Sequence, residues 1–444
     1  MMAARAERFI SVRAGNGLRA VGEIKAGAVI QIKENEGGDA IDLQSCAPFT
    51  FCVARNFLQS ACHNCVRTGE KLLRCSQCKI ARYCSVRCQK ESWAEHKTEC
   101  RCLKRVHPRI PPDSVRLTAR IIFRLVSDPQ ADAAELYSLS EHQSHLEDMS
   151  DDQRAGLSDL CRVLDMYLGE ENANPALPTH LTPINLLARV TCNCFSISNG
   201  ELQDIGVGLY PSMSLLNHDC RPNCVMVFLG KRLQLRAVRN IQPTEELTIS
   251  YTEVLVPRVE RRTQLQQQYH FQCQCQRCTT ENTDAEMLVG DEGVWLSLKD
   301  RLQDLEKLQT DQKWEELLKE CETLLAGDAV PDANVYRLRL LDLAMDASIS
   351  LDQYQKALEF GIRTLEPYRL HYPDPHPCRG VELLRVGKLQ HYLGKVEEAQ
   401  SSFRQAYDVM KVTHGAEHPL VAVVQRKLEE CRAELMGGGS SENR

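Results

Sequence analysis

The sequence predicts an α+β protein, in which a β-rich domain is interrupted by a small zinc-binding module and followed by an all-α domain. Three observations lead to this prediction. Short strand patterns alternate with turns from residue 206 to residue 251, without the repeated β-α-β pattern of a parallel sheet. Cysteine pairs at metal-ligand spacing gather between residues 62 and 100. From residue 286 onward, apolar residues recur at helical spacing.

Length and composition are those of a soluble, multidomain protein. The 444 residues exceed one ordinary core, and contents of 43% hydrophobic and 26% charged residues are typical of globular chains. No stretch reaches the apolar length of a membrane span, and residues 1–9 lack the apolar core of a secretory signal, so we expect no membrane association. The 21 cysteines indicate a reducing compartment, and we expect a protein of the cytoplasm and nucleus.

Charge is distributed unevenly along the chain, although the formal net charge is only −6. Residues 62–105 carry 11 lysines and arginines against 4 glutamates, whereas residues 280–436 carry 19 basic against 29 acidic residues. A basic module of this kind can make weak contact with a DNA phosphate backbone, and a solvated basic face is an equal alternative. The acidic module favours lysine-rich partners.

The N-terminal segment predicts a strand, Phe9-Ile-Ser-Val, followed by a turn at Gly15-Asn16-Gly17. Read as Gly-x-Gly-x-x-Ala, residues 15–20 formally match the dinucleotide-binding fingerprint. The stretch that follows is broken by glycines and ends β-rich, so no helix N-terminus is present to hold a pyrophosphate. A hairpin-like loop whose backbone approaches another ligand is favoured. The polar stretch Lys33–Ser45 is predicted to be a surface insertion.

A zinc module is predicted from four pairs of ligands, each with the short spacing that lets two donors reach one tetrahedral ion. The pairs are Cys62 with Cys65, Cys75 with Cys78, Cys84 with Cys88, and His96 with Cys100. We expect them to interleave, so that the first and third pairs bind one zinc ion and the second and fourth bind another. Buried free thiols would not generate four regularly spaced pairs.

A polar turn, Asn217–Cys224, follows an apolar run and precedes a candidate strand, Glu246–Tyr251. Three further thiols, Cys273, Cys275 and Cys278, lack an obvious fourth ligand nearby, and Cys220 is a candidate for it. The turn, the strand and the thiols would then meet at one place. Taken singly, each residue has a plainer interpretation. Asn often shapes a turn, a buried His is often a hydrogen-bonded core residue, and a Tyr at a strand end often packs in the core.

Helices are predicted in the middle region and throughout the last third. Residues 114–126 form one, capped by Asp113 or Ser114, and residues 151–170 another. The C-terminal set is Trp314–Leu325, Asn334–Leu351, Tyr354–Leu365, Arg379–Leu393, Val396–Thr413 and His418–Leu435. Similar patterns beginning at Tyr354 and Val396 indicate a tetratricopeptide-like repeat, whose curved array can hold a peptide or serve as a structural lid. Residues 437–444 are expected to be a flexible tail.

Two levels of family resemblance follow from these motifs. Residues 79–89 and 93–100 match the pattern of a MYND zinc finger, a module known for holding Pro-containing peptides. The whole chain resembles the SET- and MYND-domain lysine methyltransferases, the SMYD family, apart from the insertion at Lys33–Ser45. The matching stretches, in the family's order, are Gly15–Ala20, Gly206–Pro211, Leu216–Cys224, Glu245–Tyr251, Glu260–Arg262, Cys273–Cys278 and Thr413–Gly415.

The resemblance implies a domain order and a monomeric enzyme. Residues 1–61 and 181–251 would form the SET domain, which the MYND finger at 62–100 and a helical insert at 101–180 interrupt. A post-SET zinc segment at 252–279 and the helical domain at 280–436 would follow. Substrates would be lysine-containing proteins, such as histone tails and basic segments of signalling proteins.

The resemblance also implies a cofactor, S-adenosylmethionine, and three Zn²⁺ ions. The cofactor pocket would be lined by Asn16, Tyr137, His145, Asn193, Asn217, His218, Tyr251 and Phe271. Cys220, Cys273, Cys275 and Cys278 would hold the third zinc. Tyr251 is the predicted catalytic residue, since its hydroxyl can orient the lysine amine for in-line methyl transfer. Phe195 and Phe271 are predicted walls of the lysine channel.

Three positions depart from the family's pattern. Ala14 stands where a related member has arginine, His145 where it has asparagine, and Thr244 where glycine is usual. The first two predict weaker cofactor binding. The competing hypothesis is therefore a catalytically weak adaptor that binds peptide partners through its MYND finger and helical repeats.

Overall fold

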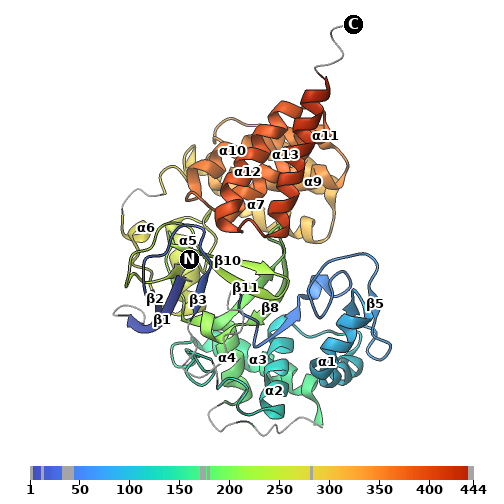
Figure 1. Cartoon of the computed structure of the whole chain (residues 1–444), viewed down its shortest axis with the longest axis vertical. Coiled ribbons are helices and arrows are strands. Elements are labelled where there is room, and N and C mark those ends of the chain that lie inside the picture. Colours follow the sequence, from blue (N-terminus) through green and yellow to red (C-terminus); the bar gives the residue numbers. More distant parts are fainter. Residues whose placement is uncertain are drawn as a thin grey trace.

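The computed structural model describes residues 4–11, 15–32, 45–133, 135–170, 177, 181–280 and 284–438. Ala14, the predicted insertion apart from Ser45, and residues 439–444 of the predicted tail lie outside this range. Figure 1 shows the C-terminal helices at one end of the molecule, a β-rich core in the middle, and the zinc finger and inserted helices at the other end. The predicted α+β architecture is confirmed.

Three sheets and one short parallel pair make up the core in the described residues. The first sheet has the order β2 (Gly15–Ala20), β1 (Ala4–Ser11), β3 (Ile30–Ile32), and the second has the order β4 (Thr50–Val53), β8 (Asp204–Leu209), β7 (Cys194–Ser198). The third is the hairpin of β10 (Cys224–Leu229) and β11 (Arg232–Ala237). The parallel pair joins β9 (Asn217–His218) to β12 (Thr248–Ile249). This pair brings the predicted turn beside the predicted strand.

The prediction of a turn at residues 15–17 is wrong, because this triplet starts β2 and pairs antiparallel with β1. The glycine at position 17 is needed for a close approach instead. A Cβ built there would lie 2.9 Å from Asn217 Nδ2 and 2.9 Å from the ring of Phe9. The missing side chain lets Asn217 reach the strand backbone. No helix follows at once, so the dinucleotide-binding interpretation is excluded for the described residues.

The predicted strand Glu246–Tyr251 is shorter than expected, since the chain changes partner within it. The Leu247 backbone N–H donates to Leu18 O on β2 at 2.8 Å, and the strand pairing with β9 covers only Thr248 and Ile249. The one alternating pattern in the sequence therefore corresponds to two short contacts, the first with β2 and the second with β9.

The zinc finger and the inserted helices share one apolar core. The finger contains β5 (Leu73–Arg74), β6 (Arg82–Tyr83) and the start of α1 (Val86–Val106), after the short helix η1 (Arg55–Phe57). The insert contains α2 (Asp113–Ser127) and α3 (Asp151–Leu168), and α4 (Pro183–Asn193) leads into β7. The cluster runs from finger residues such as Tyr83 to Ile121 of α2 and to Leu209 on β8. The finger is therefore part of the core.

The predicted cap of α2 is wrong. Pro112 occupies the cap position without a side-chain hydrogen bond, and Asp113 lies in the first turn. The Asp113 carboxylate is occupied elsewhere, because it accepts from the Arg55 backbone N–H at 3.1 Å and from Arg116 Nη2 at 2.7 Å. By contrast, the helix predicted over residues 151–170 is found as α3, which begins after a capping box at Ser150 and ends with Gly169 as its C-cap.

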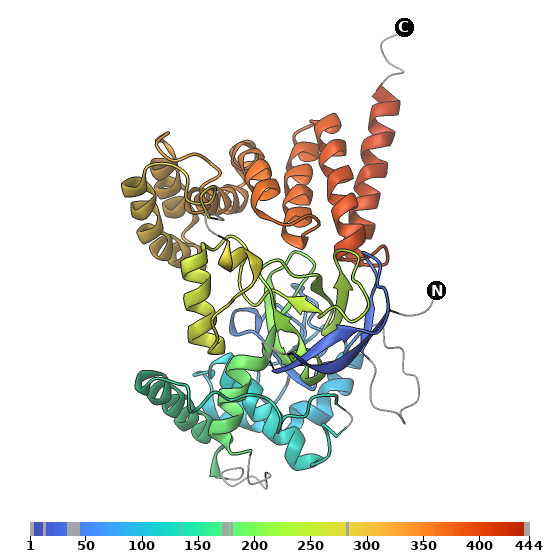
Figure 2. The ribbon, with the colours of Figure 1, turned by 90° about the vertical axis from the view of Figure 1, so that its left-hand side faces the viewer.

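The C-terminal third is helical, and its helices are stacked in pairs (Figure 2). The remaining helices are η3 (Pro211–Leu215), α5 (Arg258–Tyr269), α6 (Gln276–Thr279), α7 (Glu292–Thr310), α8 (Trp314–Leu325), α9 (Val335–Ser350), α10 (Tyr354–His371), α11 (Pro377–Tyr392), α12 (Val396–Thr413) and α13 (Pro419–Gly438). The predicted ranges of α8 and α12 are confirmed. The prediction for α10 ends too early, because the helix continues through a buried Pro367 to pack on its neighbours.

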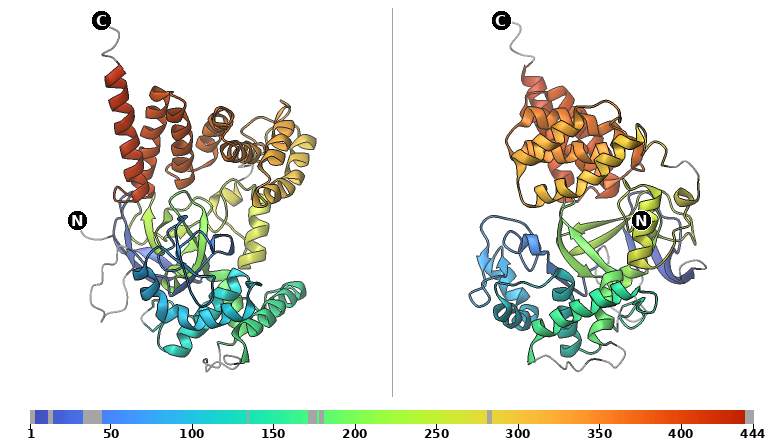
Figure 3. Two further views of the ribbon diagram at one scale, coloured as in Figure 1. Left: turned by 90° about the vertical axis from the view of Figure 1, so that its right-hand side faces the viewer. Right: turned by 180° about the vertical axis from the view of Figure 1, so that it is seen from behind.

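The helical array packs against the core (Figure 3) at several places, among them Gly27 and Glu253. At the first, Val412 of α12 packs 3.6 Å from where a Cβ on Gly27 would lie. At the second, the Tyr372 hydroxyl donates to Glu253 Oε1 at 2.7 Å. A cleft lies between the array and the core. The cleft has a volume of about 1330 Å³ and is lined by both the core and the array. None of the described helices is long and apolar enough to cross a membrane.

Candidate active site and zinc centres

Three sets of four donor atoms are preassembled, and each set lies within 4.8 Å. The sets are Cys62, Cys65, Cys84 and Cys88; Cys75, Cys78, His96 and Cys100; and Cys220, Cys273, Cys275 and Cys278. The interleaved pairing predicted for the finger is confirmed, as is the grouping of Cys220 with the three later thiols. Thiolate sulfur with imidazole nitrogen is the donor set of structural zinc sites, so all three fit Zn²⁺.

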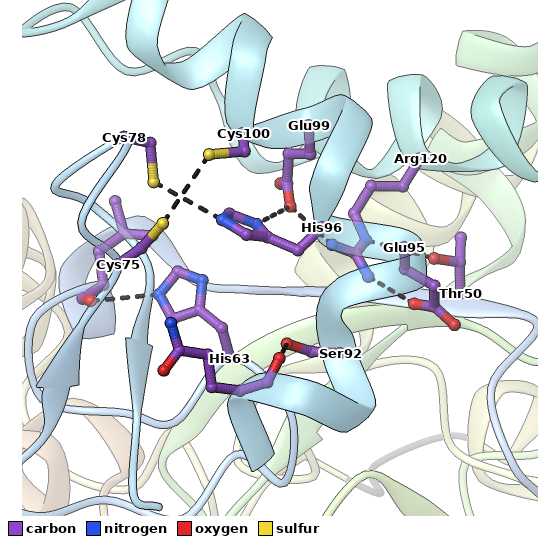
Figure 4. Close-up of polar contacts among 12 residues, drawn as sticks. Thr50, His63, Cys75, Cys78, Ser92, Glu95, His96, Glu99, Cys100 and Arg120 are labelled. Atoms are coloured by element: carbon purple, nitrogen blue, oxygen red, sulfur yellow. Dashed lines mark hydrogen bonds and ion pairs between the residues drawn. The ribbon is translucent and has the colours of Figure 1, made fainter. Parts of the chain in front are cut away.

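The second finger site is buttressed by a buried carboxylate (Figure 4). His96 turns Nε2 toward Cys78 Sγ at 3.7 Å, and its Nδ1 lies 3.5 Å from Glu99 Oε2. Arg120 of α2 donates from Nη1 to the same oxygen at 2.6 Å. A carboxylate behind a ligating histidine fixes the ring and raises its basicity.

Arg120 carries this support into the β-rich core. Its Nε donates to Thr50 Oγ1 on β4 at 3.3 Å, and its Nη2 donates to Glu95 at 2.6 Å. Burial raises the pKa of Glu99, but Arg120 and His96 outweigh it, so the pKa of this carboxyl lies below its ordinary value. The ionised pair therefore links a zinc ligand to a strand of the core.

The Asn217 side chain joins three separate segments at the other end of the core. Its Nδ2 donates to the Asn16 backbone carbonyl at 3.1 Å and to Glu246 Oε1 at 2.7 Å. Arg8 of β1 then donates to Asn16 Oδ1 at 2.9 Å. The N-terminal strands are thereby fixed to the turn that follows the apolar run. Sequence reasoning missed Arg8 and Glu246, because neither lies in a recognisable ligand pattern.

His218 connects the third zinc centre to Tyr251. The Tyr251 backbone N–H donates to His218 Nδ1 at 2.9 Å, while Nε2 lies 3.2 Å from Cys220 Sγ. Burial lowers the pKa of His218 to about 4, so the ring is neutral at physiological pH. With Nδ1 accepting, the proton is on Nε2 and points at the sulfur. Both ring nitrogens of His218 are thus engaged within the protein.

Tyr251 lies inside an aromatic group. Its hydroxyl donates to the Leu216 backbone carbonyl, and its ring lies 4.7 Å from that of Tyr269 and 6.3 Å from that of Phe271, perpendicular to it. Burial raises the pKa of the Tyr251 hydroxyl above its ordinary value, so it stays protonated at neutral pH. Phe271 also faces His218, with ring centroids 6.0 Å apart.

Two other predicted cofactor residues, Tyr137 and Asn193, lie in the segment 136–143 and at the end of α4, which contact each other. Tyr137 stacks on His142 at 4.4 Å between ring centroids, and the Arg8 guanidinium lies 5.3 Å from the Tyr137 ring centre. Asn193, at the end of α4, donates to the Gln143 backbone carbonyl at 3.0 Å. Arg8 therefore contacts both the Asn16 strand and the Tyr137 segment.

Two further residues predicted for the site, Phe195 and His145, have neighbours different from those of Tyr137 and Asn193. Phe195 packs edge-on against Tyr210, with centroids 5.7 Å apart, and belongs to the same apolar cluster as Tyr251. His145 stacks on His270 and places Nδ1 2.9 Å from Asp148 Oδ2. No direct contact between either residue and Tyr251 is recorded among the described residues.

Comparison with known proteins gives the family of this chain. Residues 15–252 match the SET domain family. The chain is 42% identical to human "Histone-lysine N-methyltransferase SMYD3" over 97% of this chain and 98% of the relative, and equally similar to the mouse protein. It is 30% identical to chicken "N-lysine methyltransferase SMYD2", covering 96% of this chain and 97% of the relative.

The chain belongs to the SMYD family of SET-domain lysine methyltransferases.

The SMYD assignment implies S-adenosylmethionine, and the residues present fit a polar ligand of this kind. Two buried nitrogens, His142 Nε2 and Arg189 Nη1, find no hydrogen-bond partner among the described residues. They belong to the Tyr137 segment and to α4. Next to Asn16, a Cβ built on Gly15 would meet no atom within 4 Å, so there is open space beside the strand backbone. Arg189 Nη1 is a spare donor, whereas His142 Nε2 is a spare acceptor, because Nδ1 of this neutral ring donates to the Ser138 carbonyl. Spare polar groups of both kinds suit a zwitterionic cofactor.

In this SMYD protein, Glu99→Gln should weaken zinc binding at the second finger site roughly tenfold, because the His96 ring loses its charged partner. Chelator competition with a colorimetric zinc indicator measures the change. Glu95→Gln is the matched control, since Glu95 contacts Arg120 but not His96. Equal zinc affinity in the two variants would contradict the role given to Glu99.

Cys220→Ser should lower the zinc content from three ions per chain to two and abolish methyl transfer, because His218 loses its sulfur contact. Elemental analysis measures the zinc content and labelled-methyl transfer measures the activity, while limited proteolysis checks that the finger stays folded. Cys321→Ser provides a control, since this buried thiol of α8 lies outside all three donor sets. A Cys220→Ser protein that keeps three zinc ions and full activity would disprove the link.

Proposed function

We propose that this SMYD protein transfers a methyl group from S-adenosylmethionine to the ε-amine of lysines in protein substrates. The observation that carries the proposal is the fixed position of Tyr251. Its hydroxyl is held by the Leu216 carbonyl, directly before Asn217, and its backbone is held by His218. Glu253, two residues further on, already lines the cleft. The chain segment that carries the proposed catalytic group therefore continues into the lining of the cleft at Glu253.

The residues contribute placement and electrostatics. When bound, S-adenosylmethionine supplies an electrophilic methyl group on a sulfonium. The lysine must arrive as a neutral amine, although its ordinary pKa is about 10.4, and burial beside aromatic rings favours loss of the proton. Burial raises the pKa of Tyr251, so its hydroxyl stays protonated at neutral pH and is not available as a base. Its hydroxyl instead orients the amine, with the Leu216 carbonyl as a second polar contact.

The charge of the cleft supports basic substrates. Seven acidic and four basic side chains line it. Each of the four cations is already ion-paired: Lys299 with Glu260, Arg339 with Glu306, Arg385 with Asp346, and Lys388 with Glu201. Burial raises the pKa of Asp342 and favours its neutral form. Glu253 accepts from the Tyr372 hydroxyl and from the Val254 backbone N–H, so no cation is recorded as its partner among the described residues. This excess favours lysine-rich segments, such as histone tails or basic parts of signalling proteins.

A second binding role is proposed for the finger. Leu73, Val86 and Trp93 are 43%, 56% and 44% exposed, which is unusual for large apolar side chains on so small a module. These three residues are the proposed contact for Pro-containing peptides, and the basic surplus nearby allows weak DNA contact. The proposal includes action as a monomer in the cytoplasm and nucleus, where reduced thiols can retain zinc.

Tyr251→Phe should lower kcat for methyl transfer by at least about a hundredfold, because the hydroxyl acts on the reacting amine. Binding of S-adenosylhomocysteine should change less than about threefold, since the ring and backbone remain. Labelled-methyl transfer onto basic peptides and calorimetry measure the two quantities.

Tyr269→Phe is the matched control, because it removes a neighbouring hydroxyl and keeps the ring contact. If Tyr251→Phe retained full kcat, the catalytic assignment would fail. If the unchanged protein bound the cofactor product but methylated no basic peptide or protein, the adaptor hypothesis would replace the enzyme.

A further inference from the structure

Two histidines, His145 and His270, stack on each other between parts of the chain that are distant in sequence. Their ring centroids are 5.0 Å apart, and their planes are inclined by 23°. Both backbones have positive φ, 51° and 58°. Asn, Asp and His adopt this left-handed conformation more readily than other side chains. The chain therefore turns sharply at both positions to bring the rings together.

The residues predicted to line the cofactor pocket fall into two halves, one containing Tyr137 and the other Tyr251. His145, on one side of the stack, belongs to the half that contains Tyr137. His145 follows the segment 136–143, which Arg8 fixes to β2 through Asn16 and Asn193 fixes to α4. The His145 ring also forms a hydrogen bond with Asp148, which lies in the same segment of the chain. A shift of the His145 ring would therefore be transmitted along the wall that carries Tyr137.

The other side belongs to the half that contains Tyr251. His270 is the C-cap of α5 and immediately precedes Phe271. The Phe271 ring faces both His218 and Tyr251. The stack is thus a direct contact between the two halves of the proposed pocket.

We propose that the His145–His270 stack is a pH-sensitive clasp that holds the two halves of the cofactor pocket together, an inference that rests on the proposed function. Neutral rings at this separation attract each other through their faces. Two protonated rings repel, since like charges about 5 Å apart oppose each other strongly at a partly buried position. Acid should therefore open the pocket and weaken cofactor binding.

The charged groups facing His270 determine the direction of this effect. Burial of the ring and the neighbouring His145 lower the pKa of His270, and Asp148 opposes them. Because the closed form binds a proton less readily than the open form, the clasp is fully formed above the ordinary histidine pKa of about 6.5. It loses stability as the pH falls through that value.

The test is calorimetric binding of S-adenosylhomocysteine to the full zinc-loaded chain at about pH 8 and about pH 6, with zinc content measured at both. The affinity of the unchanged protein should fall roughly threefold to tenfold. His145→Asn and His270→Asn should each reduce the fall to less than about twofold, since Asn tolerates the left-handed backbone. The double variant should behave like either single variant, because the stack is one unit.

Two further variants test the charge argument. Asp148→Asn keeps both rings and removes the carboxylate that offsets their charge, so the loss of affinity at about pH 6 should become larger. His391→Asn is the control, because this histidine of α11 pairs with Glu434 in the helical array. Its pH profile should match that of the unchanged protein.

The possible failures are distinguishable. Absence of cofactor-product binding at about pH 8 would contradict the proposed function itself. Binding that is equally strong at both pH values, or that keeps its pH dependence in His145→Asn and His270→Asn, would overturn the clasp and leave the function standing.

Discussion

The parallel pairing of β9 with β12 is the contact on which the site depends. Successive side chains of a strand point to opposite faces. The two residues of β9, Asn217 and His218, therefore contact different parts of the protein. Asn217 turns toward β2 and bonds to Asn16 and Glu246, whereas His218 turns toward Tyr251 and Cys220. A slip of one residue would exchange these directions and separate the N-terminal strands from the third zinc centre. The zinc ligands fix the register because Cys220 lies only two residues after His218.

Zinc serves a packing role at both ends of the core. At one end, Arg261 is fully buried and places Nη2 3.7 Å from Cys278 Sγ, so a positive charge offsets the thiolates. At the other, Arg120 joins the second finger site to Thr50. Each of these two centres is thus tied by a buried arginine to elements outside its own ligand loop. Burial of the two guanidinium groups is tolerated because both have charged or polar partners.

The sequence was most informative where spacing alone determines geometry. Cys and His pairs revealed the two donor sets of the finger, and apolar periodicity located α8 and α12 to the residue. For the third set, spacing gave three thiols and left Cys220 as a candidate, which the family resemblance supported. The sequence was least informative where a residue acts through tertiary contacts. Glycine at position 17 looked like a turn because crowding by Asn217 cannot be read from neighbours. The roles of Arg8 and Glu246 were likewise hidden, since a lone charged residue on a strand resembles an ordinary surface residue.

The pairing of β4 with β8 has a consequence for how this chain is made. The sheet joins residues near 50 to residues near 209, so β4 leaves the ribosome long before β8 exists, and β2 likewise precedes its second neighbour at residue 247. The finger has all its ligands between residues 62 and 100 and can fold at once. Zinc binding can therefore order the finger while the edge of β4 is still without its partner strand.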